Sequence, residues 1–249
     1  WVDLWTRGMV GALYLPAAAG GTRVNGKLFP LGVDLRHHGF FVSADVYGLL
    51  EADSPRVVRT TLSSYKVDVL AGGEMWRCFG APAEPLLRAV SKTLALDVKG
   101  LTLLPSGDLL WDGKAAVGKR FDLTDVAAKY LAVGTSACEF PGVAPVDRHP
   151  VQIAEPVYLT DVTTLPLATE RLSPASEITP EQLKDATELL GLLRFDRGTW
   201  AVQPLWVRAG EDKAWTGETA LDIATAKPKK GDTLGILKER ASRLLRAKS

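Results

Sequence analysis

The sequence has few of the residues that build covalent or metal-held frameworks. Of 249 residues, two are cysteine and three are histidine. Cys78 and Cys138 are far apart among apolar neighbours, a pattern typical of free buried thiols in a reducing compartment. The histidines have no Cys or Glu partners at zinc-binding spacing. We therefore expect no metal, no cofactor and an intracellular location, either the cytoplasm or an organelle interior such as the mitochondrial matrix.

Long apolar runs and a strong overall charge are also missing. No stretch approaches the ~20 apolar residues of a membrane-spanning helix, so we expect no membrane span. The formal net charge is only +1, which gives the whole chain no general attraction to nucleic acid or acidic lipid. The sequence begins at Trp1, which predicts either that a leader has been removed or that a further N-terminal segment precedes it.

The first hundred residues have the pattern of antiparallel strands. Asn25-Gly26 lies between two short β-like runs and predicts a type I′ hairpin turn, because both residues tolerate positive φ. A second hairpin is predicted from residues 101–111, which contain the turn sequence Pro-Ser-Gly-Asp. Further strands are predicted from the β-branched and aromatic residues at 39–46, 57–62, 65–70 and 75–79.

Apolar stripes predict three helices, at residues 84–96, 122–133 and 180–193. In the third, Thr179 and Gln182 have the spacing of a capping box, and Pro180 suits the first helical position. The proline- and threonine-rich stretch from 134 to 180 contains one predicted strand, 151–159. Pro156 would confine that strand to a sheet edge, because proline has no N–H to donate.

These patterns predict an α+β fold with two parts. The first is a mainly antiparallel β body with a few packing helices, residues 1–165. The second, residues 166–249, is an extended arm with the helix 180–193 and a basic C-terminal helix, 233–247.

Charge is concentrated at the C-terminus. Residues 227–249 contain eight basic and two acidic side chains, a net charge of +6 that leaves −5 for the rest of the chain. From Thr233 onward, leucines share one helical face and arginines point elsewhere. Such a segment is typical either of a solvated terminal helix or of a helix that binds a phosphate backbone. The candidate nucleic-acid contacts are Lys229, Lys230, Arg240, Arg243 and Arg246.

Two other features are candidates for chemistry. The segment 113–119 has the glycine and lysine spacing of a phosphate-binding loop, but Arg120 follows where such a loop has Ser or Thr. His37 and His38 are adjacent and would point to opposite faces of a strand, which is poor geometry for joint metal ligation. A nucleophile built from Cys138 and His149 would need a thiolate-stabilising environment that the sequence does not reveal.

Three tryptophans, Trp200, Trp206 and Trp215, fall within sixteen residues of the arm. Ordinary core packing is one interpretation. The other is that they anchor a partner, because aromatic residues are frequent at interface hot spots.

We therefore expect no catalytic residues and no enzyme activity, but a non-catalytic subunit of a large assembly. Its partners would be other protein subunits and RNA, as in a ribosome or an organellar ribosome. One alternative is an enzyme or binding protein for a phosphorylated or nucleotide ligand that uses residues 113–120. Another is a component of a protein-only assembly, such as a virion or a secretion apparatus.

Overall fold

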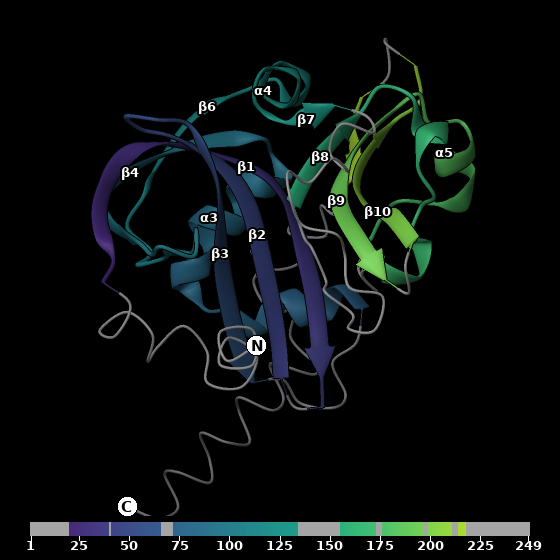
Figure 1. The fold of residues 1–249 in the computed structure, drawn as a ribbon. Coiled ribbons are helices and arrows are strands. Elements are labelled where there is room, and N and C mark those ends of the chain that lie inside the picture. Colours follow the sequence, from purple (N-terminus) through teal and green to yellow (C-terminus); the bar gives the residue numbers. More distant parts are fainter. Residues whose placement is uncertain are drawn as a thin grey trace, which may run out of the picture.

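Two mostly antiparallel sheets and a few short helices make up the described part of the chain, in agreement with the predicted α+β class (Figure 1). The computed structural model describes residues 20–39, 41–65, 72–133, 155–172, 176–196, 199–210 and 214–217. The predicted C-terminal helix, 233–247, lies outside these residues. None of the helices in the described ranges has the length and apolar character needed to cross a bilayer.

Sheet A contains the first six strands, in the order β3-β2-β1-β4-β5, with β6 also paired to β4. The strands are β1 (Thr22–His38), β2 (Phe41–Glu51), β3 (Arg56–Tyr65), β4 (Leu94–Leu103), β5 (Leu109–Leu110) and β6 (Ala116–Arg120). The β4–β5 hairpin confirms the second predicted turn. At the far end, the Arg59 amide of β3 donates to the Gly107 carbonyl at 3.0 Å. Sheet A is therefore curved so that one edge strand, β3, contacts the turn that precedes β5 at the other edge.

The concave side of sheet A encloses helix α3 (Glu84–Ser91). Alternate residues of β2, among them Val42, Ala44 and Val46, point inward and are buried with Leu86 and Leu87 of the helix. The predicted helix 84–96 is too long, because residues 94–103 alternate between buried and exposed positions and form β4. Thr93, with φ at 47°, separates the two elements.

Sheet B has the order β11-β10-β9-β8-β7 and lies beside sheet A in Figure 1. Its strands are β7 (Ala132–Val133), β8 (Glu155–Leu159), β9 (Glu188–Asp196), β10 (Thr199–Arg208) and β11 (Thr216–Gly217). Because β8 pairs with β9, the predicted boundary between residues 165 and 166 falls inside this sheet. β8 also pairs with β7, so the edge position predicted from Pro156 is wrong. Proline is tolerated because β7 spans only two residues and pairs with Val157 and Tyr158.

The predicted helix 180–193 is wrong beyond its first turn. The capping box of Thr179 and Gln182 is present, but α5 (Pro180–Lys184) ends early and β9 follows. Both faces of β9 are covered, with Leu190 and Leu192 in the core shared with sheet A and Leu189 and Leu193 in a second core. A strand buried on both faces has a continuous apolar sequence, which here matches helical spacing by coincidence.

The hairpin turn predicted at Asn25-Gly26 is also wrong, because both residues lie inside β1. The pairing of β1 with β4 shifts register here, and Gly100 is the extra residue, with φ at 66°. Its amide donates to Oδ1 of Asn25 at 2.8 Å. A Cβ on Gly26 would lie 2.4 Å from the carbonyl oxygen of Glu51, so the glycine permits close strand approach.

Within the described ranges, the remaining short elements are helix α4 (Leu123–Tyr130) and four 3₁₀ helices. Asp122 caps α4 by accepting from the amides of Thr124 and Asp125. The 3₁₀ helices are η1 (Gly72–Cys78), η2 (Ala81–Ala83), η4 (Val162–Thr164) and η5 (Thr169–Arg171). The strand predicted at 75–79 is therefore a 3₁₀ helix, whose Met75 and Trp76 are fully buried in the core. Of the strand predicted at 65–70, only Tyr65 is among the described residues.

Candidate functional site

The two sheets meet where each has an irregular strand. β1 shifts register between residues 30 and 32, and β10 shifts between residues 204 and 206. Gly32 lies directly against Leu205, since a Cβ on the glycine would be 2.6 Å from the leucine Cδ1. A side chain on Gly32 would therefore push the sheets apart.

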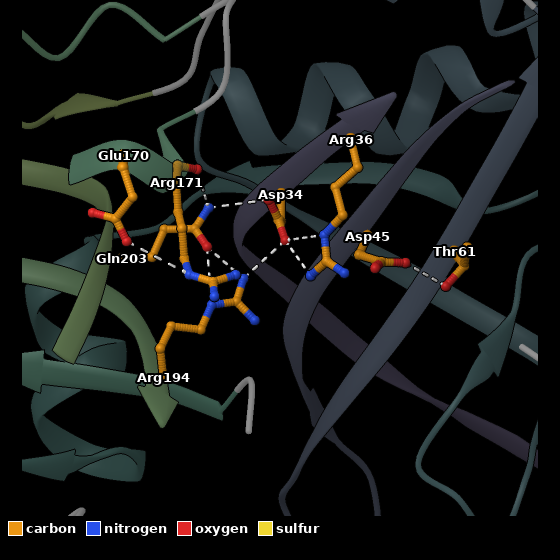
Figure 2. Close-up of polar contacts among 8 residues, drawn as sticks. All are labelled: Asp34, Arg36, Asp45, Thr61, Glu170, Arg171, Arg194 and Gln203. Atoms are coloured by element: carbon orange, nitrogen blue, oxygen red, sulfur yellow. Dashed lines mark hydrogen bonds and ion pairs between the residues drawn. The ribbon is translucent and has the colours of Figure 1, made fainter. Parts of the chain in front are cut away.

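A buried cluster of charged and polar side chains lies beside this contact (Figure 2). We call Asp34, Arg36, Arg194 and Gln203 the inter-sheet cluster. Arg194 of β9 donates from Nη2 to Oδ2 of Asp34 at 2.9 Å, and from Nε to Oε1 of Gln203 at 3.0 Å. Gln203 of β10 donates from Nε2 to Oδ1 of Asp34 at 3.0 Å and to the Arg171 carbonyl at 2.9 Å. Asp34, Arg194 and Gln203 are each 3% exposed or less, so these bonds are shielded from water.

Arg36 extends the cluster over the outer face of sheet A. It donates from Nε to Oδ2 of Asp34 at 2.7 Å, and its side chain is 45% exposed. On the neighbouring strands, Asp45 is the register partner of Asp34 and accepts from the Thr61 hydroxyl at 2.6 Å. Two carboxylates in register repel each other, and the arginine between them offsets this repulsion.

The electrostatic balance of the cluster keeps Asp34 ionised. Burial alone would raise the pKa of Asp34, but the guanidiniums of Arg36 and Arg194 and the amide of Gln203 outweigh it and hold the pKa below its ordinary value of 3.8. Because all three neighbours donate to it, this carboxylate is poorly suited to accept a proton from a substrate. The cluster is suited instead to hold the sheets together.

A dependence of stability on pH follows from this lowered pKa. A carboxyl whose pKa is lower in the folded state stabilises the fold above its unfolded pKa, and this contribution is lost as the pH falls. We expect the urea midpoint to decrease as the pH is lowered from 7 to below about 4, and to decrease less in an Asp34→Asn variant. Urea titrations at several pH values measure this. If the urea midpoints of both proteins decrease equally with pH, the lowered pKa of Asp34 does not contribute to stability.

A second polar cluster connects α4 to sheet B. The Tyr158 hydroxyl donates to Oε2 of Glu188 at 2.5 Å, and Arg208 forms an ion pair with the same carboxylate. The Arg208 guanidinium lies 5.2 Å from the ring centre of Trp215, whose Nε1 donates to the Thr124 hydroxyl at 3.2 Å. Burial and the bond to Glu188 raise the pKa of Tyr158, so its hydroxyl remains a donor.

Of the three tryptophans predicted to anchor a partner, Trp206 is 4% exposed and cannot do so in this fold. Its Nε1 donates to the Leu31 carbonyl at 2.9 Å, another bond between the sheets. Trp200 is half-buried, with its ring centre 4.8 Å from that of Phe195, and Trp215 is half-buried beside Tyr158. Trp206 is therefore a core residue. Trp200 and Trp215 are partly exposed, and each packs against an aromatic side chain of sheet B.

The glycine-lysine segment lies at a sheet edge. Gly113 has a φ of 79°, and residues 116–120 form β6. A phosphate-binding loop connects a strand to a helix, whereas this segment leads into a strand. Lys114 and Lys119 are exposed, and Arg120 donates from Nε to the Thr93 hydroxyl at 3.2 Å.

The other sequence candidates are dispersed or lie outside the described residues. His37 is exposed on β1, and Cys78 is half-buried at the end of η1. Cys138, His149 and the five basic tail residues are not among the described positions. Within the described ranges, no three His, Cys, Asp or Glu side chains are grouped so that they could hold a metal ion.

The sequence reasoning missed the inter-sheet cluster, although two signals were present. Arg194 is a lone cation in the apolar run Leu-Leu-Gly-Leu-Leu-Arg-Phe, and Asp34 stands between Val33 and Leu35. A charge inside an apolar strand is usually buried with a partner. No family model matches this chain, and a search of curated proteins finds no match.

Proposed function

We propose that this protein is a non-catalytic subunit of a large RNA-containing assembly, and that its basic C-terminal segment contacts the RNA. The observation that carries the proposal is the segregation of charge, +6 on residues 227–249 and −5 on the remainder. Arginines and lysines gain affinity for a phosphate backbone by releasing its counterions. An acidic remainder favours an orientation in which the tail faces the RNA.

The described part of the chain fits the role of a scaffold. Its most deeply buried charged groups, Asp34 and Arg194, bind each other across the two sheets. The exposed Lys114 precedes strand β6 and the exposed Lys119 lies on it, without the strand–loop–helix arrangement of a phosphate-binding loop. These observations favour the assembly proposal over the nucleotide-binding alternative.

Reversing the charge of the tail tests the proposal. In the full-length protein, changing Arg240, Arg243 and Arg246 to glutamate should weaken binding to a labelled single-stranded RNA of mixed sequence. If each arginine neutralises one phosphate, the slope of log affinity against log salt should become shallower by about two to three. Fluorescence anisotropy over a range of salt concentrations measures both effects.

The matched control makes the same charge change on the body, at the exposed residues Lys99, Lys114 and Lys119. It should leave the affinity and the slope near those of the wild type. If the control variant loses as much affinity as the tail variant, the effect is one of general charge and the tail assignment is wrong. Sedimentation from a gentle lysate complements this test, because a fast peak should collapse after ribonuclease treatment.

A further inference from the structure

An aromatic pair is exposed at one end of sheet A. Phe41 and Tyr65 are direct register partners on β2 and β3, and they are 43% and 79% exposed. Their ring centres are 5.0 Å apart, with the planes at 71°, so the rings pack edge to face. We call these two residues the aromatic platform. Tyr65 in particular keeps most of its ring open to solvent.

The neighbours of the platform on the same face of sheet A are polar. The next register pair along the strands is Ser43 and Ser63, and Ser43 is paired on its other side with Arg36. With a rise of about 3.3 Å per residue, the row that contains Arg36 lies about 7 Å from the row that contains the rings. One nucleotide can contact both rows.

An arginine is exposed near the platform. Arg36 is paired with Asp34, but the arginine side chain is 45% exposed whereas the aspartate side chain is 4% exposed. Solvent at this position therefore meets the Arg36 guanidinium, while Asp34 lies beneath it and Asp45 is half-buried on the same face. A guanidinium attracts phosphate and donates several hydrogen bonds to it.

We propose that the aromatic platform stacks bases of single-stranded RNA, with Arg36 contacting an adjacent phosphate. This inference rests on the proposed function and assigns a second RNA contact, separate from the C-terminal tail. Aromatic side chains on an open sheet face stack unpaired bases of any type, and a nearby cation holds the backbone. A duplex would keep its bases covered, so the ligand is single-stranded.

The extent of the apolar surface favours RNA over a protein partner. Among the described residues, the next exposed large apolar residue on β3 is Val57, at the opposite end of that strand, so the described exposed apolar area here consists of the two rings. Stable protein interfaces bury about 800 Å² on each partner and have an apolar centre. Two rings flanked by serine hydroxyls match the size of one or two bases.

The platform and the tail can be separated experimentally, because stacking and counterion release respond differently to salt. In the full-length protein, Phe41→Ala and Tyr65→Ala should each weaken binding to the labelled single-stranded RNA by about tenfold. The slope of log affinity against log salt should stay unchanged, whereas the tail variant makes it shallower. Tyr65→Phe should bind like the wild type, because stacking needs the ring and not the hydroxyl.

The controls are Val57→Ala and Val117→Ala, which change exposed apolar residues elsewhere on sheet A and should not alter binding. If the wild type binds RNA and the platform variants bind equally well, the platform proposal is overturned while the proposed function stands. If the wild type binds no RNA at any salt concentration, both are overturned. If the variants keep RNA affinity but lose a fast-sedimenting peak that resists ribonuclease, the platform contacts a protein and the RNA proposal is wrong.

Discussion

Replacing Asp34 with alanine is expected to lower the free energy of unfolding by about 3–5 kcal/mol, the usual cost of removing one partner from a buried ion pair. The variant leaves the Arg194 guanidinium buried, with Gln203 as its remaining partner among the described contacts. In the wild type, Nη1 of Arg194 already has no acceptor among the described residues, so no second partner stands ready. This loss would be a large fraction of the total stability of a domain, which is about 5–15 kcal/mol.

The loss of stability is also expected to differ between the two charges of the buried pair, Asp34 and Arg194. Arg194→Met should cost less than Asp34→Ala, because Asp34 keeps Arg36 as a partner and can reach water along it. The double variant Asp34→Ala/Arg194→Met should recover part of the loss, since it leaves no unpaired charge between the sheets. Urea denaturation of all three variants gives the coupling energy directly.

The matched control for this prediction is an exposed ion pair. Glu84 and Arg88 lie 3.8 Å apart on α3, with side chains 41% and 49% exposed. Glu84→Ala should change the free energy of unfolding by about 0.5 kcal/mol or less. If Asp34→Ala is no more destabilising than this control, the cluster does not hold the sheets together.

The second large effect is expected at Trp206. Trp206→Ala should lower the free energy of unfolding by about 3–5 kcal/mol, because it removes a buried indole from the core that both sheets share. Trp206→Phe keeps a ring in place but leaves the Leu31 carbonyl without its donor, and it should cost about 1–3 kcal/mol.

Trp200 provides the comparison for this series. It is half-buried on the other side of sheet B, so Trp200→Ala should be less destabilising than Trp206→Ala. Urea titrations followed by circular dichroism measure all three variants. An equal cost at the two tryptophans would indicate that Trp206 contributes only its apolar area and not a contact between the sheets.

Local chemistry made parts of this fold predictable from the sequence. The turn between β4 and β5, the aspartate cap of α4 and the capping box of α5 depend on residues within a few positions of one another. Where a distant segment decides the outcome, the same reasoning failed. The leucines of β9 have helical spacing, and only burial between two layers makes them a strand.

The same distinction between local and distant contacts applies to the predicted hairpin turn and to the inter-sheet cluster. Asn25-Gly26 has the composition of a turn, yet β4 lies alongside and turns it into strand pairing with a bulge. Asp34 and Arg194 are 160 residues apart, so no spacing rule could connect them. Each was visible separately as a charge in an apolar run, which indicates burial but not the partner.

The order of the two sheets along the chain has a consequence for synthesis. Every strand of sheet A precedes residue 121, whereas the strands of sheet B begin at residue 132. A chain that emerges from its N-terminus can therefore complete sheet A before β9 and β10 exist, in line with the N-terminal-first folding of nascent chains. During this interval the face that will receive Arg194 is open to water. Arg36, only two residues from Asp34, gives the carboxylate a counter-charge within the same strand until Arg194 and Gln203 arrive.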